Sequence, residues 1–172
     1  MKMKYSMKRL FAALTGVMLT LAVVCAPVLL SGQEVSAAQA NNEERVIVLG
    51  SGLSEAERTG TLEQLGIDPQ SGVVLHTVTG SDAERFINQS IADSSMISSV
   101  TVEFKEEGSG VNTKIVTLEN ITKVKTYQYS NAAITAGIYD CEIIVGSIRP
   151  VTGNSALTGV YKAAEIQGIE LD

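Results

Sequence analysis

The chain has 172 residues, of which 13 are lysine or arginine and 19 are aspartate or glutamate, and its formal net charge is −6. A negative surface repels nucleic acid and anionic lipid, so we expect neither as a partner. The length is sufficient for one compact domain with a sizeable core.

The first forty residues have the pattern of a secretory signal peptide. A cationic start precedes an apolar run from Leu10 to Leu30, and small-residue cleavage sites follow at 35–37 (VSA) and 38–40 (AQA). We predict that residues 1–40 are removed on export and that residues 41–172 form a single extracytoplasmic α/β domain. Because the removed segment holds four basic residues and one glutamate, the formal net charge would fall from −6 to −9.

Two alternatives to cleavage stay open. The apolar run is long enough to span a bilayer, so it can be retained as a membrane anchor. Cys25 at its end suggests a lipoprotein, although Val24 is bulkier than the residue that normally precedes a lipidated cysteine. Pro27 and the two cleavage sites favour a signal peptide, after whose removal we expect no membrane attachment.

The first half of the remaining chain predicts two strands and two helices. The β-branched run 46–49 is typical of a buried strand. A Ser-x-x-Glu capping box at Ser54 and Glu57 begins a helix that Gly66 closes. A second strand is predicted over 73–78. A second capping box at 81–84 then begins a helix on which Phe86, Ile87 and Ile91 share a face.

The second half predicts three strands and two helices. Residues 100–104 and 114–118 read as an antiparallel β-hairpin around the glycine-containing turn 106–110. Apolar residues spaced by threes and fours predict a helix over 122–138. A further strand follows over 142–148, and either Asn154 or Ser155 caps the last helix.

A short motif occurs twice. Residues 78–80 and 151–153 both read Val-Thr-Gly, and each copy follows a predicted strand and begins a helix. The fold class is therefore predicted as α/β, a mixed sheet with helices, with two βαβα repeats joined by the β-hairpin. The alternative is coincidence, because glycine followed by a polar cap is an ordinary start for a helix.

Motifs for catalysis, metals and cofactors are nearly all missing from the sequence. His76 lies in an apolar strand and Cys141 in an apolar run, which favours structural roles for both. One histidine and one cysteine make a zinc site improbable. Gly50-x-Gly52 lacks the third glycine of a dinucleotide fingerprint, and no Walker motif is present. We predict no catalytic residue, no metal site and no cofactor.

Acidic residues leave one enzymatic alternative open. Paired carboxylates for hydrolysis of a wall polymer depend on a spatial separation that sequence does not give. Glu103, Glu106 and Glu107 lack the spacing of a calcium loop, so they are interpreted as solvated residues near a hairpin tip.

One group of residues supports a ligand-binding hypothesis. If the halves are repeats, two helix N-termini lie at equivalent strand ends, where free N–H groups attract anions. The alternative is that these side chains only cap their own helices. The candidate ligand-binding residues are Thr79, Gly80, Ser81, Arg149, Thr152, Gly153 and Asn154.

The chain resembles a known family. The segments 131–138 (NAAITAGI), 149–153 (RPVTG) and 156–163 (ALTGVYKA) are similar to the secreted bacterial family called domain of unknown function 1002, the YpuA-like proteins. The resemblance implies an exported protein without an established activity, cofactor or catalytic residue. Typical members continue past the helix that contains Tyr161, so the resemblance implies either a short variant or a chain whose C-terminal helical part is missing.

Three functions are compatible with these observations. The first is a non-catalytic, secreted module that binds an envelope partner or a small anionic ligand, or has a structural role, at the cell envelope. The second is a cell-wall polymer hydrolase that uses paired carboxylates. The third is an assembly subunit, for which we expect a bare apolar patch on the surface.

Overall fold

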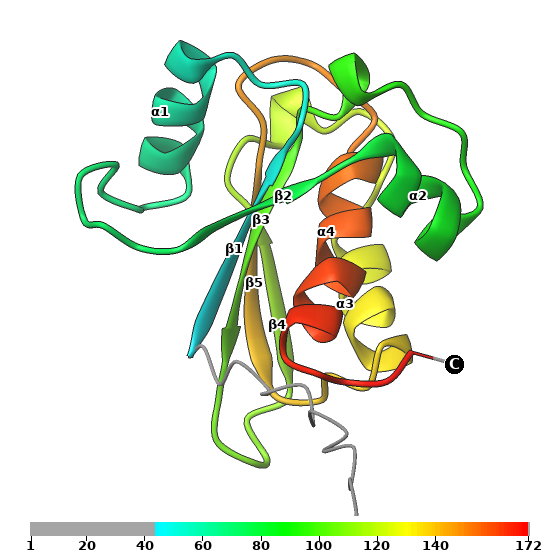
Figure 1. Ribbon diagram of the computed structural model, residues 1–172. Coiled ribbons are helices and arrows are strands. Elements are labelled where there is room, and N and C mark those ends of the chain that lie inside the picture. The colour runs from blue at the N-terminus through cyan, green and yellow to red at the C-terminus, as the bar shows by residue number, and fades with distance from the viewer. Residues whose placement is uncertain (1–43, 172) are drawn as a thin grey trace, which may run out of the picture. The chain divides into compact units, whose positions relative to one another are not determined.

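The computed structural model of the protein describes residues 44–171 (Figure 1). The predicted signal peptide lies outside these residues, so its cleavage stays a prediction. Within the described range, no helix is both long and apolar enough to cross a bilayer.

Strands and helices alternate along the described chain, except that β4 follows β3 directly (Figure 1). Two short 3₁₀ turns, Asp93–Ser95 and Leu118–Asn120, lie in the connections. The elements are β1 (Arg45–Gly50), α1 (Glu55–Gln64), β2 (Leu75–Val78), α2 (Gly80–Ile87), β3 (Ser99–Phe104), β4 (Val111–Ile115), α3 (Thr126–Thr135), β5 (Cys141–Gly146) and α4 (Asn154–Ile166).

The strands form one mixed sheet in the order β2-β1-β3-β5-β4. β2 is parallel to β1 and β4 is parallel to β5, whereas β3 is antiparallel to both of its neighbours. β3 therefore runs opposite to the other strands. The predicted α/β class with a mixed sheet is confirmed.

Helices cover both faces of the sheet, as Figure 1 shows. On one face α1 packs on Ile47 and Leu49 of β1. On the other face α2, α3 and α4 pack on the alternate residues of the same strands, among them Val46 and Val48. This alternation follows from the period of two in a β-strand, which sends successive side chains to opposite faces.

The predicted β-hairpin is wrong. β3 and β4 follow one another in the chain, but β5 lies between them and pairs with both. Ile143 and Val145 of β5 are fully buried, whereas β4 carries the exposed Asn112 and Lys114. Because the more apolar strand gains more from burial, β5 takes the central position and β4 the edge.

The predicted duplication is not confirmed. The order strand, helix, strand, helix does occur twice, as β1-α1-β2-α2 and β4-α3-β5-α4. The connection from β1 to β2 and the connection from β4 to β5 run in the same direction across the sheet. However, the helices in these connections, α1 and α3, lie on opposite faces. The two crossovers therefore have opposite hands, so the halves do not superpose as copies of one unit.

One helix begins where the sequence predicts, and the other three begin at different residues. The capping box of α1 is confirmed, since Ser54 accepts from the Glu57 N–H and Glu57 accepts from the Ser54 N–H. The capping box of α2 starts two residues earlier than predicted, at Thr79. Its helix ends at Ile87, so Ile91 is not part of it.

The last two helices also begin at other residues than predicted. α3 starts at Thr126 rather than near Thr122, because residues 121–124 bond to the backbone of Val151 and Thr152 instead. The N-cap of α4 is Gly153, at φ 99°, and not a side-chain cap from Asn154 or Ser155.

Gly159 allows α4 to lie close to the sheet. A Cβ at this position would lie 2.7 Å from Val100 Cγ1 on β3 and 3.4 Å from Val48 Cγ1 on β1. Both valines are fully buried, so they have little room to move.

We predict that Gly159→Ala destabilises the protein, although alanine is the better helix former. Overpacking costs about 1–3 kcal/mol and exceeds a propensity gain of about 1 kcal/mol. Urea unfolding measures the difference. Gly60→Ala on α1 is the matched control, because its Cβ would meet only the mobile end of Ile148 at 3.1 Å. A Gly159→Ala protein as stable as the Gly60→Ala protein would contradict this packing.

Candidate functional site

Glycines at the carboxyl ends of β1 and β2 lie against the segment 91–99, which connects α2 to β3. A Cβ on Gly50 would lie 2.1 Å from the Met96 carbonyl oxygen, and one on Gly80 would lie 2.0 Å from another carbonyl oxygen of the segment. The Gly52 N–H donates to the Met96 carbonyl at 2.8 Å. Ligands of α/β sheets commonly bind outside strand carboxyl ends. Here Gly50-x-Gly52 accommodates the protein's own backbone.

The N-terminus of α2 is satisfied by its own side chains. The Thr79 hydroxyl accepts from the Asp82 N–H, the Asp82 carboxylate accepts from the Thr79 N–H, and Ser81 Oγ lies 2.8 Å from Thr79 Oγ1. The buried Gly80 N–H donates to the Asp93 carboxylate at 2.6 Å. An internal carboxylate therefore lies where an external anion would bind.

The N-terminus of α4 is satisfied in a different way. The Ala156 N–H donates to Ser98 Oγ at 3.0 Å, and the Asn154 N–H donates to Thr152 Oγ1 at 3.4 Å. The Asn154 amide donates to Gln89 at 2.5 Å. Gly153 needs its positive φ and has no room for a side chain, since a Cβ would lie 2.5 Å from the Tyr129 hydroxyl.

The seven predicted ligand-binding residues bond to several different parts of the described structure. Arg149 forms an ion pair with Glu57, which belongs to the first turn of α1. The two Thr-Gly turns are contacted by the same connecting segment, through Asp93 at one end and Ser98 at the other. Ligand binding at these turns stays a prediction.

A close pair of carboxylates lies on the sheet face that α1 leaves open. Glu103 and Glu142 are register partners on β3 and β5. Lys105 pairs with both of them, and Arg45 pairs with Glu103. Hydrogen bonds from Lys105 and then from Arg45 hold the pKa of Glu103 below its ordinary value. A general acid needs the opposite shift.

Other candidate reactive groups have structural surroundings. Cys141 is 1% exposed, and burial, with a further contribution from Asp140, raises the pKa of its thiol to about 11. A protonated, buried thiol is a poor nucleophile. His76 lies in β2 with a half-buried side chain. Among residues 44–171, no group of three or more histidine, cysteine, aspartate or glutamate side chains is arranged to hold a metal ion.

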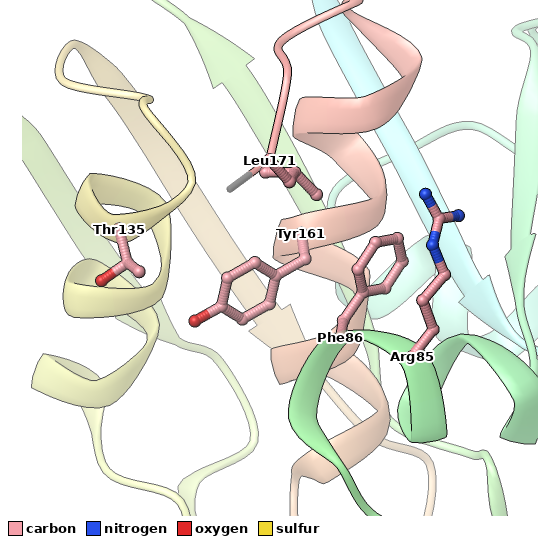
Figure 2. Close-up of a pocket in the computed structure, with 5 residues that line it drawn as sticks. All are labelled: Arg85, Phe86, Thr135, Tyr161 and Leu171. Atoms are coloured by element: carbon pink, nitrogen blue, oxygen red, sulfur yellow. The ribbon is translucent and has the colours of Figure 1, made fainter.

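A concavity of about 170 Å³ lies where α2, α3, α4 and the C-terminal segment meet. Figure 2 shows the Tyr161 ring between α2 and α3, with its hydroxyl directed towards the side of Thr135. We call this feature the α2–α4 concavity. Its lining residues are Arg85, Phe86, Thr135, Tyr161 and Leu171.

An aromatic pair and a cation line one side of the concavity. The rings of Phe86 and Tyr161 stack with centroids 6.1 Å apart and planes 17° from parallel. The Arg85 guanidinium lies 4.7 Å from the centre of the Phe86 ring, on a side chain that is 61% exposed. Such cation–π contacts orient a guanidinium while leaving its donors accessible.

A charged network fixes this wall of the concavity. Lys162 bonds to Asp82 on α2 at 3.2 Å and to Glu165 at 2.8 Å, and Glu165 also bonds to Arg85 at 2.5 Å. Burial works to raise the pKa of Asp82, but hydrogen bonds from Thr79 and Lys162 outweigh it and lower this pKa. The same balance, with bonds from Lys162 and Arg85, lowers the pKa of Glu165.

Sequence reasoning did not identify this concavity. Phe86 and Tyr161 fall on apolar helix faces, which indicates a core position as readily as an exposed one. The pairing of α2 with α4 brings them together across 75 residues of chain. The available signal was the pair Arg85-Phe86 at the end of an amphipathic helix, which is common in packed domains.

Comparisons with known proteins agree with the resemblance seen in the sequence. The family described as "Protein of unknown function (DUF1002)" matches residues 49–172. The chain is 30% identical over 152 residues to "Uncharacterized protein YpuA" of Bacillus subtilis (strain 168). The match covers 86% of this chain and 51% of the relative, so the chain spans about half the relative's length. No solved structure matches the chain significantly.

We predict that Asp93 is required to satisfy the N-terminus of α2. Asp93→Ala leaves the buried Gly80 N–H without its acceptor and should cost about 1–2 kcal/mol of stability. Asp93→Asn retains an oxygen acceptor and should cost clearly less. Urea unfolding at neutral pH, with Ser94→Ala as the control, measures both. Equal stability of the alanine and asparagine variants would contradict the proposed bond.

We also predict an acid-sensitive contribution from the Lys162 network. Because the pKa values of Asp82 and Glu165 are lowered, their stabilisation is complete above the ordinary values of 3.8 and 4.5 and is lost as the pH falls below them. Lys162→Met should cost about 1–2 kcal/mol at pH 7. The difference from wild type should shrink as the pH falls below 4.5.

Urea midpoints measured across this pH range test the prediction. Lys123→Met, which removes an exposed lysine before α3, is the matched control and should show no such trend. A Lys162→Met deficit that is the same at pH 7 and pH 3 would show that the loss comes from packing rather than from charge.

Proposed function

The chain belongs to the family "Protein of unknown function (DUF1002)", and we propose that it is a non-catalytic, exported module that binds a partner at the cell envelope. The signal-peptide pattern of residues 1–40 supports export. The α2–α4 concavity supports binding, since it combines an aromatic pair on a fixed wall with the Arg85 guanidinium, which is 61% exposed and bonded to Glu165 through one nitrogen. It is the single observation on which the proposed binding role depends.

The size and lining of the concavity define what it accepts. An apolar cavity of about 150 Å³ binds benzene, and this concavity measures about 170 Å³, so it accommodates one ring-sized group. Phe86 and Tyr161 suit an aromatic ring, and Arg85 suits an adjacent carboxylate. The proposed ligand is therefore an aromatic side chain of a partner with a negative group beside it.

The paired-carboxylate hydrolase is supported less well. Glu103 is hydrogen-bonded by Lys105 and Arg45, and its pKa is lowered. Catalysis of glycoside hydrolysis requires one carboxylic acid that stays protonated at working pH. The same lysine lies 3.9 Å from Glu142, the other member of the pair.

An assembly subunit is a second candidate, favoured by the outer face of α3. Tyr127 and Ile134 of this helix are 64% and 46% exposed, and they stand seven residues apart, on the same side of the helix. Thr135, the next residue, lines the concavity. An assembly partner would therefore cover the exposed face of α3 and the concavity together.

We predict that N-acetylphenylalanine, which offers a ring and a carboxylate, binds in the concavity with millimolar affinity. NMR amide shifts of the full chain should change at Arg85, Phe86 and Tyr161. N-acetylphenylalanine amide should bind more weakly, because it lacks the charge that pairs with Arg85.

A variant that fills the concavity, together with a matched control, makes this test specific. Thr135→Phe places a ring in the concavity from exposed α3 and should abolish the shifts. Asn131→Phe adds the same ring one turn earlier on the helix and should leave them unchanged. Shifts that persist in Thr135→Phe, or that never arise in wild type, would refute binding at this site.

A further inference from the structure

Among the described strands, β2 lies at the edge of the sheet, and no second strand pairs with its outer side. Its neighbour in the sheet is β1, and the Ser51 N–H donates to the Val78 carbonyl at 3.0 Å. In a parallel ladder alternate residues direct both backbone groups to the same neighbour. Because Val78 faces β1, Leu75 and Thr77 direct their N–H and C=O groups away from the sheet.

Within the described residues, this short edge strand carries no lysine or proline of its own, although Arg58 of α1 donates to the Thr77 hydroxyl at 3.4 Å. Soluble proteins place lysine, proline or covering elements along free edges to prevent pairing with other chains. β4, the opposite edge, carries Lys114. From 69 to 81 the chain has no lysine, arginine, aspartate or glutamate. Val73, Val74 and Leu75 are 44%, 59% and 39% exposed.

A second cavity lies beside the start of this edge. It measures about 270 Å³ and is lined by Glu44, Arg45, Val73 and Glu103. Glu103 is already paired with two cations, Arg45 in the cavity and Lys105 beside it. The attraction for a basic side chain therefore comes from the exposed Glu44 carboxylate and from the formal net charge of −6 on the whole chain.

We propose that the residues 73–78 form a recognition edge, to which an extended peptide segment that alternates apolar with basic residues is added as a further strand. Backbone hydrogen bonds to Leu75 and Thr77 supply affinity, and a lysine or arginine side chain enters the cavity beside Glu44. A second copy of this chain would bring a second uncharged strand but also a second Glu44, so charge disfavours it.

The proposed edge shares no residue with the α2–α4 concavity, so either site can fail without the other. It also explains why two valines directly before the edge strand and the first leucine of that strand are exposed, which is costly for solubility unless a partner covers them. Main-chain recognition of this kind tolerates variation in the partner sequence, with specificity set by the cavity.

The experiment uses the full chain and a synthetic peptide of about eight residues in which lysine alternates with valine, the length of an ordinary strand. Amide NMR shifts should appear along 73–78. A peptide with N-methyl groups on all backbone nitrogens should not bind, because neither of its edges then has N–H donors. A peptide with glutamate in place of lysine should bind more weakly.

Two variants and one control define the edge. Leu75→Pro removes an outward N–H that β1 does not use, and Val74→Lys adds a charge to the edge. Each should raise the dissociation constant at least about tenfold. Leu118→Lys changes another exposed apolar residue, 69% exposed and outside the edge, and should have no effect.

Three results would overturn the proposal. The first is peptide binding that leaves 73–78 unperturbed, and the second is equal binding of the N-methylated peptide. The third is sedimentation showing that the wild-type chain, but not Val74→Lys, self-associates without peptide, which would identify a second copy as the occupant.

Discussion

The close approach of the segment 91–99 to the glycines at the ends of β1 and β2 is the constraint on which the rest of the structure depends. A Cβ on Gly50, Gly52 or Gly80 would overlap with carbonyl groups of this segment. Because these positions are glycines, the segment passes directly over the strand ends and enters the sheet as β3. β3 then separates the two parallel strand pairs, and α4 packs on it through Gly159.

The same segment determines where ligands are able to bind. Asp93 and Ser98 satisfy the N-termini of α2 and α4, which in many α/β proteins face a ligand at the strand carboxyl ends. With internal groups in these positions, the accessible recognition features lie elsewhere. They are the aromatic and cationic concavity between the helices and the uncharged edge of β2.

Sequence reasoning succeeded where the signal is local. Ser54, Glu57 and Gly66 predict α1 because a capping box and a positive-φ glycine act within a few residues. Four of the strands were found from their β-branched runs, whereas the strand predicted at 114–118 lies at Val111–Ile115. What failed depends on groups far apart in the chain: β5 displaces β4 from its expected partner, and Ser98 caps α4 from 58 residues away. The ion pair between Arg149 and Glu57 of α1 was also missed, because no local pattern in the sequence indicates that these two residues are partners.

The position of β3 also bears on how the chain folds. Each parallel strand pair is joined through a single helix and is assembled from neighbouring parts of the sequence. β3, by contrast, pairs Glu103 with Arg45 at 58 residues' separation, and Ser99 with Gly146 at its other side. Closing such long loops costs entropy before any contact compensates for it. Within the sheet, the one reversed strand therefore carries the largest entropic cost of loop closure, and it joins two strand pairs that are each built from neighbouring parts of the chain.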